Sequence, residues 1–347
     1  MSDTLSADGA RAAVLEPRAL VSALKPFATP HTGRSIWELA ITIVPFFAVM
    51  LGMLFALDAG YWIALALVPL AGLLLLRTFI IQHDCGHGAF LAKRNGNDWI
   101  GRALGVLTFT PYDCWRRSHT LHHANTGNLD ARGFGDVDTL TIREYYAASP
   151  LKRAFYRAYR HPAVLLGIGP AYLFLLRHRL PVGLMGQGMV YWISALATNL
   201  ATAVILAILV YAFGAATTAL VVIPSLLFAA SMGVWLFYIQ HQFETAHWDA
   251  GQDWSFHEAA LHGSTYLDLP QPLRWFTANI GIHHVHHLAS RIPFYRLSRV
   301  LDAHPELRSL NRFTMRQTIS PLKLALWDED SRRLVTFREA ARLAPQG

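Results

Sequence analysis

The stretch His83-Asp84-Cys85-Gly86-His87 decides how this chain is organised. It places two histidines four residues apart, directly after an apolar run at residues 61–82. On a helix, residues four apart lie on one face, so both imidazoles can reach a common metal ion. Two later stretches repeat the pattern, His119-Thr120-Leu121-His122-His123 and His283-His284-Val285-His286-His287. The three stretches, called boxes below, therefore predict a metal site built from distant parts of the chain.

The number of histidines indicates two metal ions. A neutral imidazole binds iron, copper, zinc or nickel well, and the boxes offer more nitrogens than one ion with an open position needs. Zinc has no redox chemistry, so iron is expected where an oxidation is catalysed. The predicted ligands are His83, His87, His119, His122, His123, His283, His286 and His287, with His241 as a ninth.

Polar residues near the boxes are expected to orient the imidazole rings by accepting their second N–H. The candidates are Asp84, Asn279, Glu244, Asp136 and Asp138, each of which can instead be an ordinary solvated or capping group. Asn279 precedes the third box by four residues, so it faces the metals if the helix extends that far. His284 is out of step with its box and is assigned a supporting or structural role.

The other histidines are expected to lie outside the metal site. Interfacial or supporting positions are expected for His247, His257 and His262, and surface positions for His31, His161, His178 and His304.

Four apolar runs are long enough to cross a membrane, since about 20 apolar residues do so as a helix. They are residues 36–57, 61–82, 188–213 and 217–239. The composition agrees, because 53% of the residues are hydrophobic and only 15% are charged, whereas roughly a quarter are charged in soluble domains. Within the second run, Arg77 is expected to extend its side chain to the membrane interface. Residues 95–111 are expected to form an interfacial or re-entrant segment, and residues 163–176 are expected to lie in the interface.

The placement of basic residues predicts the orientation. No Lys or Arg occurs between Arg34 and Arg77, or between Arg179 and Arg274. By the positive-inside rule, the three boxes and both termini face the cytoplasm. We therefore expect an all-α integral protein of the inner (cytoplasmic) membrane, with four transmembrane helices in two hairpins and a histidine-rich cytoplasmic cap.

Three segments are expected along the chain. They are a polar cytoplasmic N-terminal segment at residues 1–34, a membrane domain at 35–305, and a cytoplasmic C-terminal tail at 306–347. The first segment lacks the apolar core and cleavage site of a signal peptide.

The charge and the cysteines limit the possible partners. The net charge of +7 suits anionic lipid and an acidic electron carrier, and no nucleic-acid partner is expected because the basic residues flank apolar runs. With only two cysteines, Cys85 and Cys114, a disulfide scaffold is excluded and a reducing compartment is suggested. No haem-binding or iron–sulfur cysteine motif is visible, so electrons are expected from another protein.

At these boxes the sequence resembles the membrane fatty-acid desaturase family, and more narrowly the bacterial acyl-lipid desaturases. The family pattern HxxxH, HxxHH and HxxHH is met at residues 83–87, 119–123 and 283–287. Further likeness lies at residues 111–112, 115–119, 126–130, 240–244 and 279–281. The third box begins with His283 where many relatives have Gln, which leaves the pattern intact.

The resemblance covers residues 35–305 and implies a cytoplasm-facing di-iron centre. It further implies O2 as co-substrate, an acyl chain or membrane lipid as substrate, and a ferredoxin-like or cytochrome-like electron donor. The implied reaction inserts a cis double bond, using O2 and two electrons. The boxes alone do not separate a desaturase from a hydroxylase or ketolase of alkanes, carotenoids or sphingolipids. A metal transporter is a remote alternative. A transporter needs its ligands near the middle of the bilayer, whereas the boxes lie beyond the ends of the apolar runs.

Overall fold

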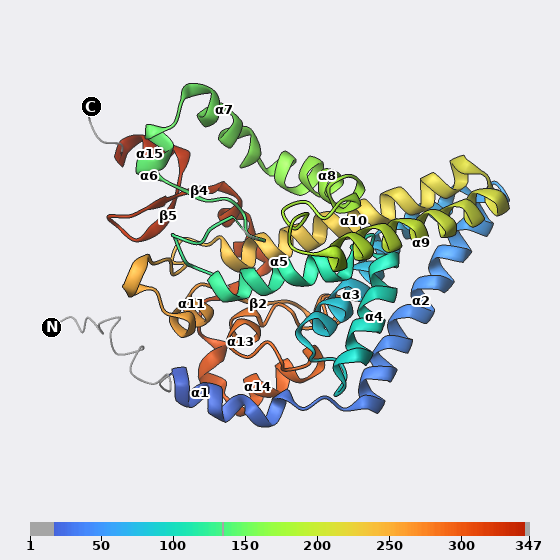
Figure 1. Ribbon diagram of the computed structural model, residues 1–347, viewed down its shortest axis with the longest axis horizontal. Coiled ribbons are helices and arrows are strands. Elements are labelled where there is room, and N and C mark those ends of the chain that lie inside the picture. The colour runs from blue at the N-terminus through green and yellow to red at the C-terminus, as the bar shows by residue number, and fades with distance from the viewer. Residues whose placement is uncertain (1–16, 134, 344–347) are drawn as a thin grey trace.

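The computed structural model describes residues 17–133 and 135–343 (Figure 1). This part of the chain is mostly helical, and four of its helices are long and apolar enough to cross a membrane. They are α2 (Thr32–Asp58), α3 (Val68–His87) with the preceding 3-10 turn η3 (Trp62–Leu67), α9 (Met189–Phe213) and α10 (Ala215–His241). The predicted helical membrane architecture is therefore confirmed.

The ends of these helices follow from local sequence. The His31 side chain accepts the Arg34 backbone N–H and caps the start of α2. Helix α3 continues beyond its apolar run and ends at Gly88, whose φ of +68° is the left-handed conformation that glycine adopts without strain. The first box therefore lies on the last turns of α3.

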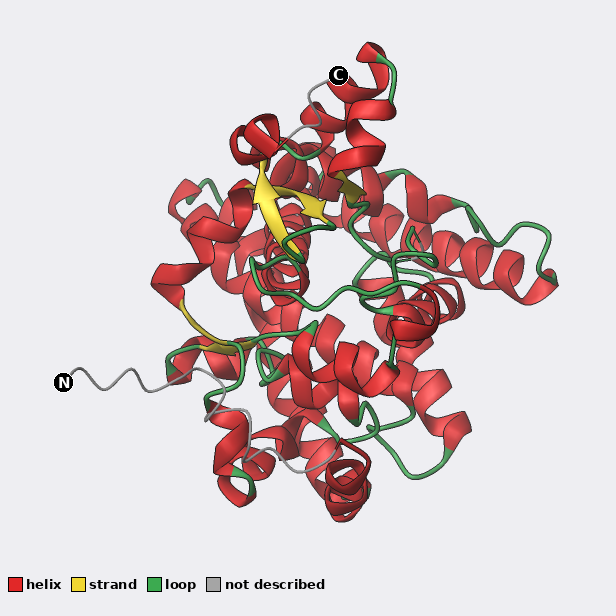
Figure 2. Ribbon diagram, turned by 90° about the vertical axis from the view of Figure 1, so that its left-hand side faces the viewer, coloured by secondary structure: helices red, strands yellow, loops and turns green. Residues whose placement is uncertain are grey.

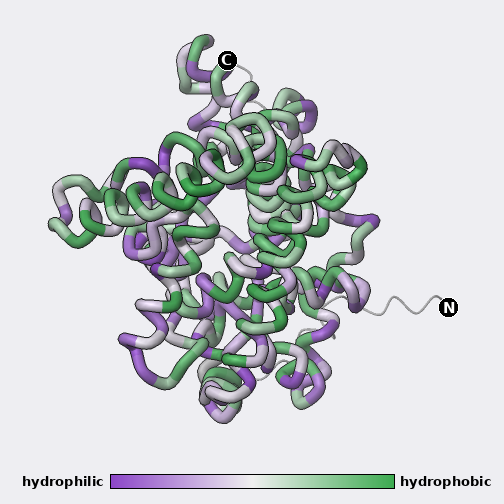
Figure 3. Tube along the Cα trace, turned by 90° about the vertical axis from the view of Figure 1, so that its right-hand side faces the viewer, coloured by the Kyte–Doolittle hydropathy of each residue, from purple (hydrophilic) through white to green (hydrophobic). Residues whose placement is uncertain are grey.

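The long helices form one bundle. Helix α10 packs against α3, while α2 packs against α3 and α9 against α10. Large apolar side chains are exposed along α2 and α9, and the tube of the long helices is mostly in the hydrophobic colour (Figure 3). These faces suit contact with lipid chains.

Arg77 does not extend out of the helix bundle, contrary to the prediction that its side chain reaches outward. Its side chain is 2% exposed and forms an ion pair with Glu38 of α2. It also donates to Thr42 Oγ1 at 2.9 Å and to the Trp275 carbonyl, and its guanidinium lies 4.2 Å from the centre of the Trp275 ring. A carboxylate on the neighbouring helix satisfies the charge inside the protein, so the side chain has no need to reach water.

Two helices connect the spans to the second box. Helix α4 (Arg94–Leu107) packs against α3 and α9, and α5 (Tyr112–Asn125) carries the box. The segment at 163–176 forms a π-helical turn η4 (Val164–Ile168) and α8 (Gly169–Leu175), both packed along α10. The interfacial position of these segments stays a prediction.

Short strands, which the sequence did not predict, pair distant segments of the cap (Figure 2). One sheet has the order β1-β4-β5, with β1 (Leu140–Thr141) parallel to β4 (Leu324–Asp328) and β4 antiparallel to β5 (Arg333–Thr336). The other pairs β2 (Tyr266–Asp268) with β3 (Arg312–Thr314) in parallel.

The remaining helices belong to the cap and its edges. They are α1 (Pro17–Leu24), α6 (Ile142–Ala147), α7 (Pro150–Tyr159), α11 (Phe256–His262), α12 (Gln271–Phe276), α13 (His283–Leu288), α14 (Leu297–Ala303) and α15 (Phe337–Leu343). Short 3-10 turns lie at Lys25–Ala28, Arg177–Arg179, Gly251–Asp253, Phe294–Arg296, Pro305–Arg308 and Met315–Lys323.

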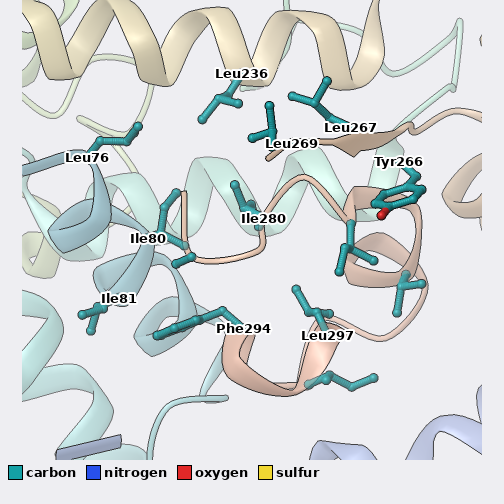
Figure 4. Packing of buried hydrophobic residues seen from close by; sticks show 14 of the residues in the cluster. Leu76, Ile80, Ile81, Leu236, Tyr266, Leu267, Leu269, Ile280, Phe294 and Leu297 are labelled. Atoms are coloured by element: carbon teal, nitrogen blue, oxygen red, sulfur yellow. The ribbon is translucent and has the colours of Figure 1, made fainter. Parts of the chain in front are cut away.

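The main hydrophobic core joins the spans to the cap (Figure 4). Ile80 and Ile81 of α3 and Leu236 of α10 belong to the same buried cluster as Ile280 and Phe294, which flank the third box. Leu20 and Leu24 of α1 join this cluster as well. The core therefore holds the first and third boxes together, although 200 residues separate them.

Candidate metal centre

The structure brings the nine histidines together in two groups. Within each group, the candidate ligand atoms all lie within 4.8 Å of one another. The five-histidine group contains His83, His87, His119, His123 and His286. The four-histidine group contains His122, His241, His283 and His287.

Adjacent histidines serve different groups. On α5, His122 belongs to the four-histidine group and His123 to the other, and the same division separates His287 from His286 on α13. Successive residues of a helix point about 100° apart because one turn takes 3.6 residues. The paired histidines thus place α5 and α13 beside both groups.

The spacing of the nitrogens fits one ion in each group. Neighbouring Nε2 atoms are 3.0–3.2 Å apart in the five-histidine group and 2.9–3.2 Å apart in the four-histidine group. Two imidazoles bound at right angles to one ion, with bonds of about 2.1 Å, hold their nitrogens about 3.0 Å apart.

Protein hydrogen bonds alone do not satisfy these rings. One imidazole N–H satisfies one neighbouring nitrogen, whereas four or five nitrogens meet in each group. Burial, with smaller contributions from neighbouring histidines, lowers the pKa of several rings well below the usual value, which keeps them in the neutral, metal-binding form. This holds for His119, His123, His283, His286 and His287. The donor set therefore fits a metal ion in each group.

Three rings of the four-histidine group are oriented through Nδ1. The Asp136 carboxylate contacts His122 Nδ1, in the position that the sequence predicted. His241 Nδ1 lies 3.3 Å from the Gly263 carbonyl. The Thr126 hydroxyl lies 3.5 Å from His287 Nδ1. Sequence reasoning missed these last two partners, because a backbone carbonyl and a threonine carry no recognisable signal.

Asp84 holds the third-box segment rather than a histidine ring. Its Oδ2 accepts the Phe294 backbone N–H at 2.7 Å, whereas its Oδ1 lies 3.6 Å from His83 Nδ1. The Asp84 carboxylate therefore lies near the His83 ring but beyond hydrogen-bond distance of its Nδ1. The predicted hydrogen bond between Asp84 and a ligand ring is not formed.

Two further carboxylates predicted to orient ligands face elsewhere. Asp138 is exposed, and no histidine among the described residues hydrogen bonds to its carboxylate. The Glu244 side chain is 63% exposed and pairs with Arg333 at 3.2 Å. Helix α10 ends at His241, so Glu244 follows a different path from the ligand before it.

Asn279 also does not face the histidine groups. It adopts the left-handed conformation with a φ of +56°, and α13 begins only at His283. Its side-chain amide donates to the Phe294 carbonyl at 3.2 Å. The assumed continuation of the helix to Asn279 was wrong.

The other histidines lie outside both groups. His284 is buried and its Nε2 donates to the Leu307 carbonyl at 3.0 Å, which is a structural role. His31 and His161 are exposed, and His304 pairs with Glu306 at 3.2 Å. Half-buried positions are held by His247, His257 and His262. The surface assignment was wrong for His178 and His304, because both are half-buried. Burial lowers the pKa of His178 to about 3.

Trp115 is a part of the site that sequence reasoning did not assign. Its ring stacks on His119 at 4.6 Å with an angle of 17°, and its edge meets Phe79 at 5.3 Å. A Cβ at Gly86 would approach the Trp115 ring to 2.8 Å, so the glycine inside the first box makes room for the tryptophan. The spacing of four residues between Trp115 and His119 on α5 was the available signal.

An apolar cavity of about 120 Å³ lies among the long helices. Its lining comes from α2, α3, α4, α9 and α10, and includes Phe46, Met50, Leu75, Leu107, Leu206 and Leu226. Its two hydroxyl-bearing residues, Thr202 and Ser225, donate to backbone carbonyls, at 3.3 and 2.7 Å. The cavity therefore presents an apolar surface to an occupant.

Comparison with known proteins gives a consistent result. The fatty acid desaturase family model matches residues 59–318, which include all nine histidines. A fatty acid desaturase of Bacillus subtilis (strain 168) is 40% identical over 319 residues, which are 92% of this chain and 90% of that protein. An sn-1 acyl-lipid omega-3 desaturase (ferredoxin) of Synechocystis is 31% identical over 67% of this chain and 64% of its own length.

A second Synechocystis protein, an sn-1 oleoyl-lipid 12-desaturase, is 27% identical over 65% of this chain and 64% of its own length. With a family match over most of the chain and four membrane-length helices, the likeness reaches well beyond the boxes. The chain belongs to the fatty acid desaturase family of membrane-bound oxidoreductases that act on fatty acids.

Proposed function

We propose that this protein is a dioxygen-dependent acyl-lipid desaturase with a di-iron centre. The reaction converts –CH2–CH2– of an acyl chain, O2, two electrons and two protons into a cis –CH=CH– unit and two molecules of water. The observation that carries the proposal is the division of nine buried or half-buried imidazoles into groups of five and four, each with converging Nε2 atoms.

In this proposal, each group holds one iron ion. Acid–base groups cannot remove hydrogen from a methylene, because it has no acidic proton, and iron supplies the redox chemistry that this step needs. The protein supplies neutral imidazoles, and Asp136 fixes which nitrogen of His122 faces the ion. Trp115 covers one side of His119 and limits the contact of that ring with water.

The proposed substrate is an acyl chain of a membrane lipid. The apolar cavity among the spans offers surroundings suited to a hydrocarbon chain, and its lining leaves no free hydroxyl to be desolvated. Two relatives are named as acyl-lipid or oleoyl-lipid desaturases, which supports the same substrate class.

The electrons are proposed to come from a ferredoxin-like or cytochrome-like protein. The chain has only two cysteines, too few for an iron–sulfur cluster of its own, and one relative is named as a ferredoxin enzyme. We place the metal groups and both termini on the cytoplasmic side of the inner membrane. The turns at residues 58–60 and 214–216, which this topology puts on the outer side, carry no Lys or Arg. We also propose that the membrane domain extends from residue 35 to residue 305, between a polar N-terminal segment and a C-terminal tail.

Expression in a host that lacks desaturases, with labelled acyl chains, tests the reaction. Mass spectrometry of the lipids should show loss of two hydrogens without added oxygen. An added hydroxyl or keto group would instead establish a hydroxylase or ketolase with the same metal ligands. Iron analysis of the purified protein tests the centre separately, and protein without iron would refute it. Export or uptake of metal without lipid modification would favour a transporter.

A further inference from the structure

Arg160 is a buried cation outside both histidine groups. Arg160 directly follows the last residue of α7 and is 3% exposed. No acidic side chain among the described residues pairs with it. Its Nε is buried and has no hydrogen-bond partner in this part of the chain. Burying a charge without a counter-ion is costly, so the contacts that the guanidinium does make need an explanation.

One side of the guanidinium binds the segment that carries Asp136. Nη1 of Arg160 donates to the Asp138 carbonyl at 3.2 Å and lies 3.4 Å from Thr139 Oγ1. The Asp138 carbonyl is two residues beyond Asp136, whose carboxylate contacts His122. This side of Arg160 therefore fixes the backbone that holds a ring of the four-histidine group.

The other side binds the end of α10. Nη2 donates to Gln242 Oε1 at 2.8 Å, to the Tyr238 hydroxyl at 3.0 Å and to the Leu324 carbonyl of β4 at 2.9 Å. Gln242 directly follows His241, and Tyr238 lies about one helical turn before it. Figure 1 shows α7 extending from the region of α6 and α15 to α8. The contacts of Arg160 thus join the end of α10 to β4 and to the segment at Asp138.

We propose that Arg160 is a positioning residue for the four-histidine group. Its planar fork binds two segments at once, one next to His241 and one next to the contact between Asp136 and His122. A lysine, with a single point charge, cannot reproduce this geometry. The inference rests on the proposed metal centre and assigns no direct contact with a metal to Arg160.

The test compares the wild type with Arg160→Lys and Arg160→Met, purified in detergent and equilibrated with isotopically labelled iron. Iron per chain is measured against chelators of increasing strength, and Mössbauer spectra follow the two iron populations. One population should bind about tenfold more weakly or worse, as for the loss of other residues that orient ligands. The second population should keep the wild-type affinity.

Arg179→Lys is the matched control. Arg179 is half-buried, and it donates to Asn199 Oδ1 at 2.7 Å and to the Phe109 carbonyl at 2.5 Å, again without a carboxylate. These partners contact neither histidine group, so this variant should keep both iron populations. Circular dichroism and gel filtration establish that the compared variants are folded.

Any result other than a selective loss of one iron population in the Arg160 variants overturns the inference. Wild-type affinity for both irons in Arg160→Lys removes the positioning role, and equal losses in Arg179→Lys reduce it to general destabilisation. If neither Arg160 variant folds, Gln242→Met must show the same selective loss, and retention of both irons there is decisive against the inference. A wild type without iron would refute the proposed centre first, which separates that failure from this one.

Discussion

Asp136→Asn tests the metal centre most directly, because it changes one atom type at one ring. The carboxylate contacts His122 Nδ1. Among the described residues, it is the only carboxylate that contacts a ring of the four-histidine group. Asparagine keeps the size of the side chain but loses the charge that strengthens this hydrogen bond.

The expected effect is confined to one of the two proposed iron ions. Loss of such an orienting partner typically weakens metal binding about 10- to 100-fold, which is about 1.4–2.8 kcal/mol since every tenfold change is about 1.4 kcal/mol. The five-histidine group should keep its ion, because Asp136 contacts none of its rings. Iron per chain should therefore fall in a separate, earlier step when purified protein is titrated with a chelator.

Asp138→Asn is the matched control, because it removes the same charge two residues away. Its carboxylate is exposed and hydrogen bonds to no histidine of the described residues. The control should follow the wild-type titration. A wild-type curve for Asp136→Asn, or an equal loss of iron in both variants, would refute the assigned role of Asp136.

Three other predictions concern separate parts of the molecule. His122→Ala should abolish desaturation and lower bound iron without affecting membrane insertion. His304→Ala should leave the lipid products unchanged. Full activity of His122→Ala, or loss of activity in His304→Ala, would contradict the ligand assignment. Arg77→Met breaks a buried ion pair, so denaturant unfolding in detergent should show a loss of about 3–5 kcal/mol, and an unchanged midpoint would count against it. Gly86→Ala should displace Trp115 and lower the free energy of unfolding by about 1–3 kcal/mol through overpacking. An unchanged melting temperature would mean that the Trp115 ring moves aside without loss of stability.

Local spacing made the spans and the histidine boxes predictable. The length of an apolar run identifies a membrane-length helix, and a spacing of three or four residues identifies one helical face. The partner of Arg77 was not predictable in this way, because Glu38 belongs to another helix and only packing brings the two to the same level.

The supporting residues were predicted poorly for a related reason. Closeness in sequence suggested that Asp84 and Asn279 orient the rings beside them. A helix turns neighbouring side chains apart, and the left-handed conformation of Asn279 ends the regular periodicity on which its assignment depended. Arg160 and Trp115 act across long sequence separations or by stacking, for which a single sequence offers little signal.

The contacts of Arg77 also constrain how the protein is made. Its carbonyl acceptor at Trp275 lies 198 residues further along the chain, and a ribosome adds about 5–20 residues per second. For about 10–40 s after Arg77 is added, therefore, its Nη1 donor lacks the acceptor that it has in the folded protein. A chain that stops before residue 275 lacks this acceptor, so Arg77 Nη1 must then be satisfied by water or by another group.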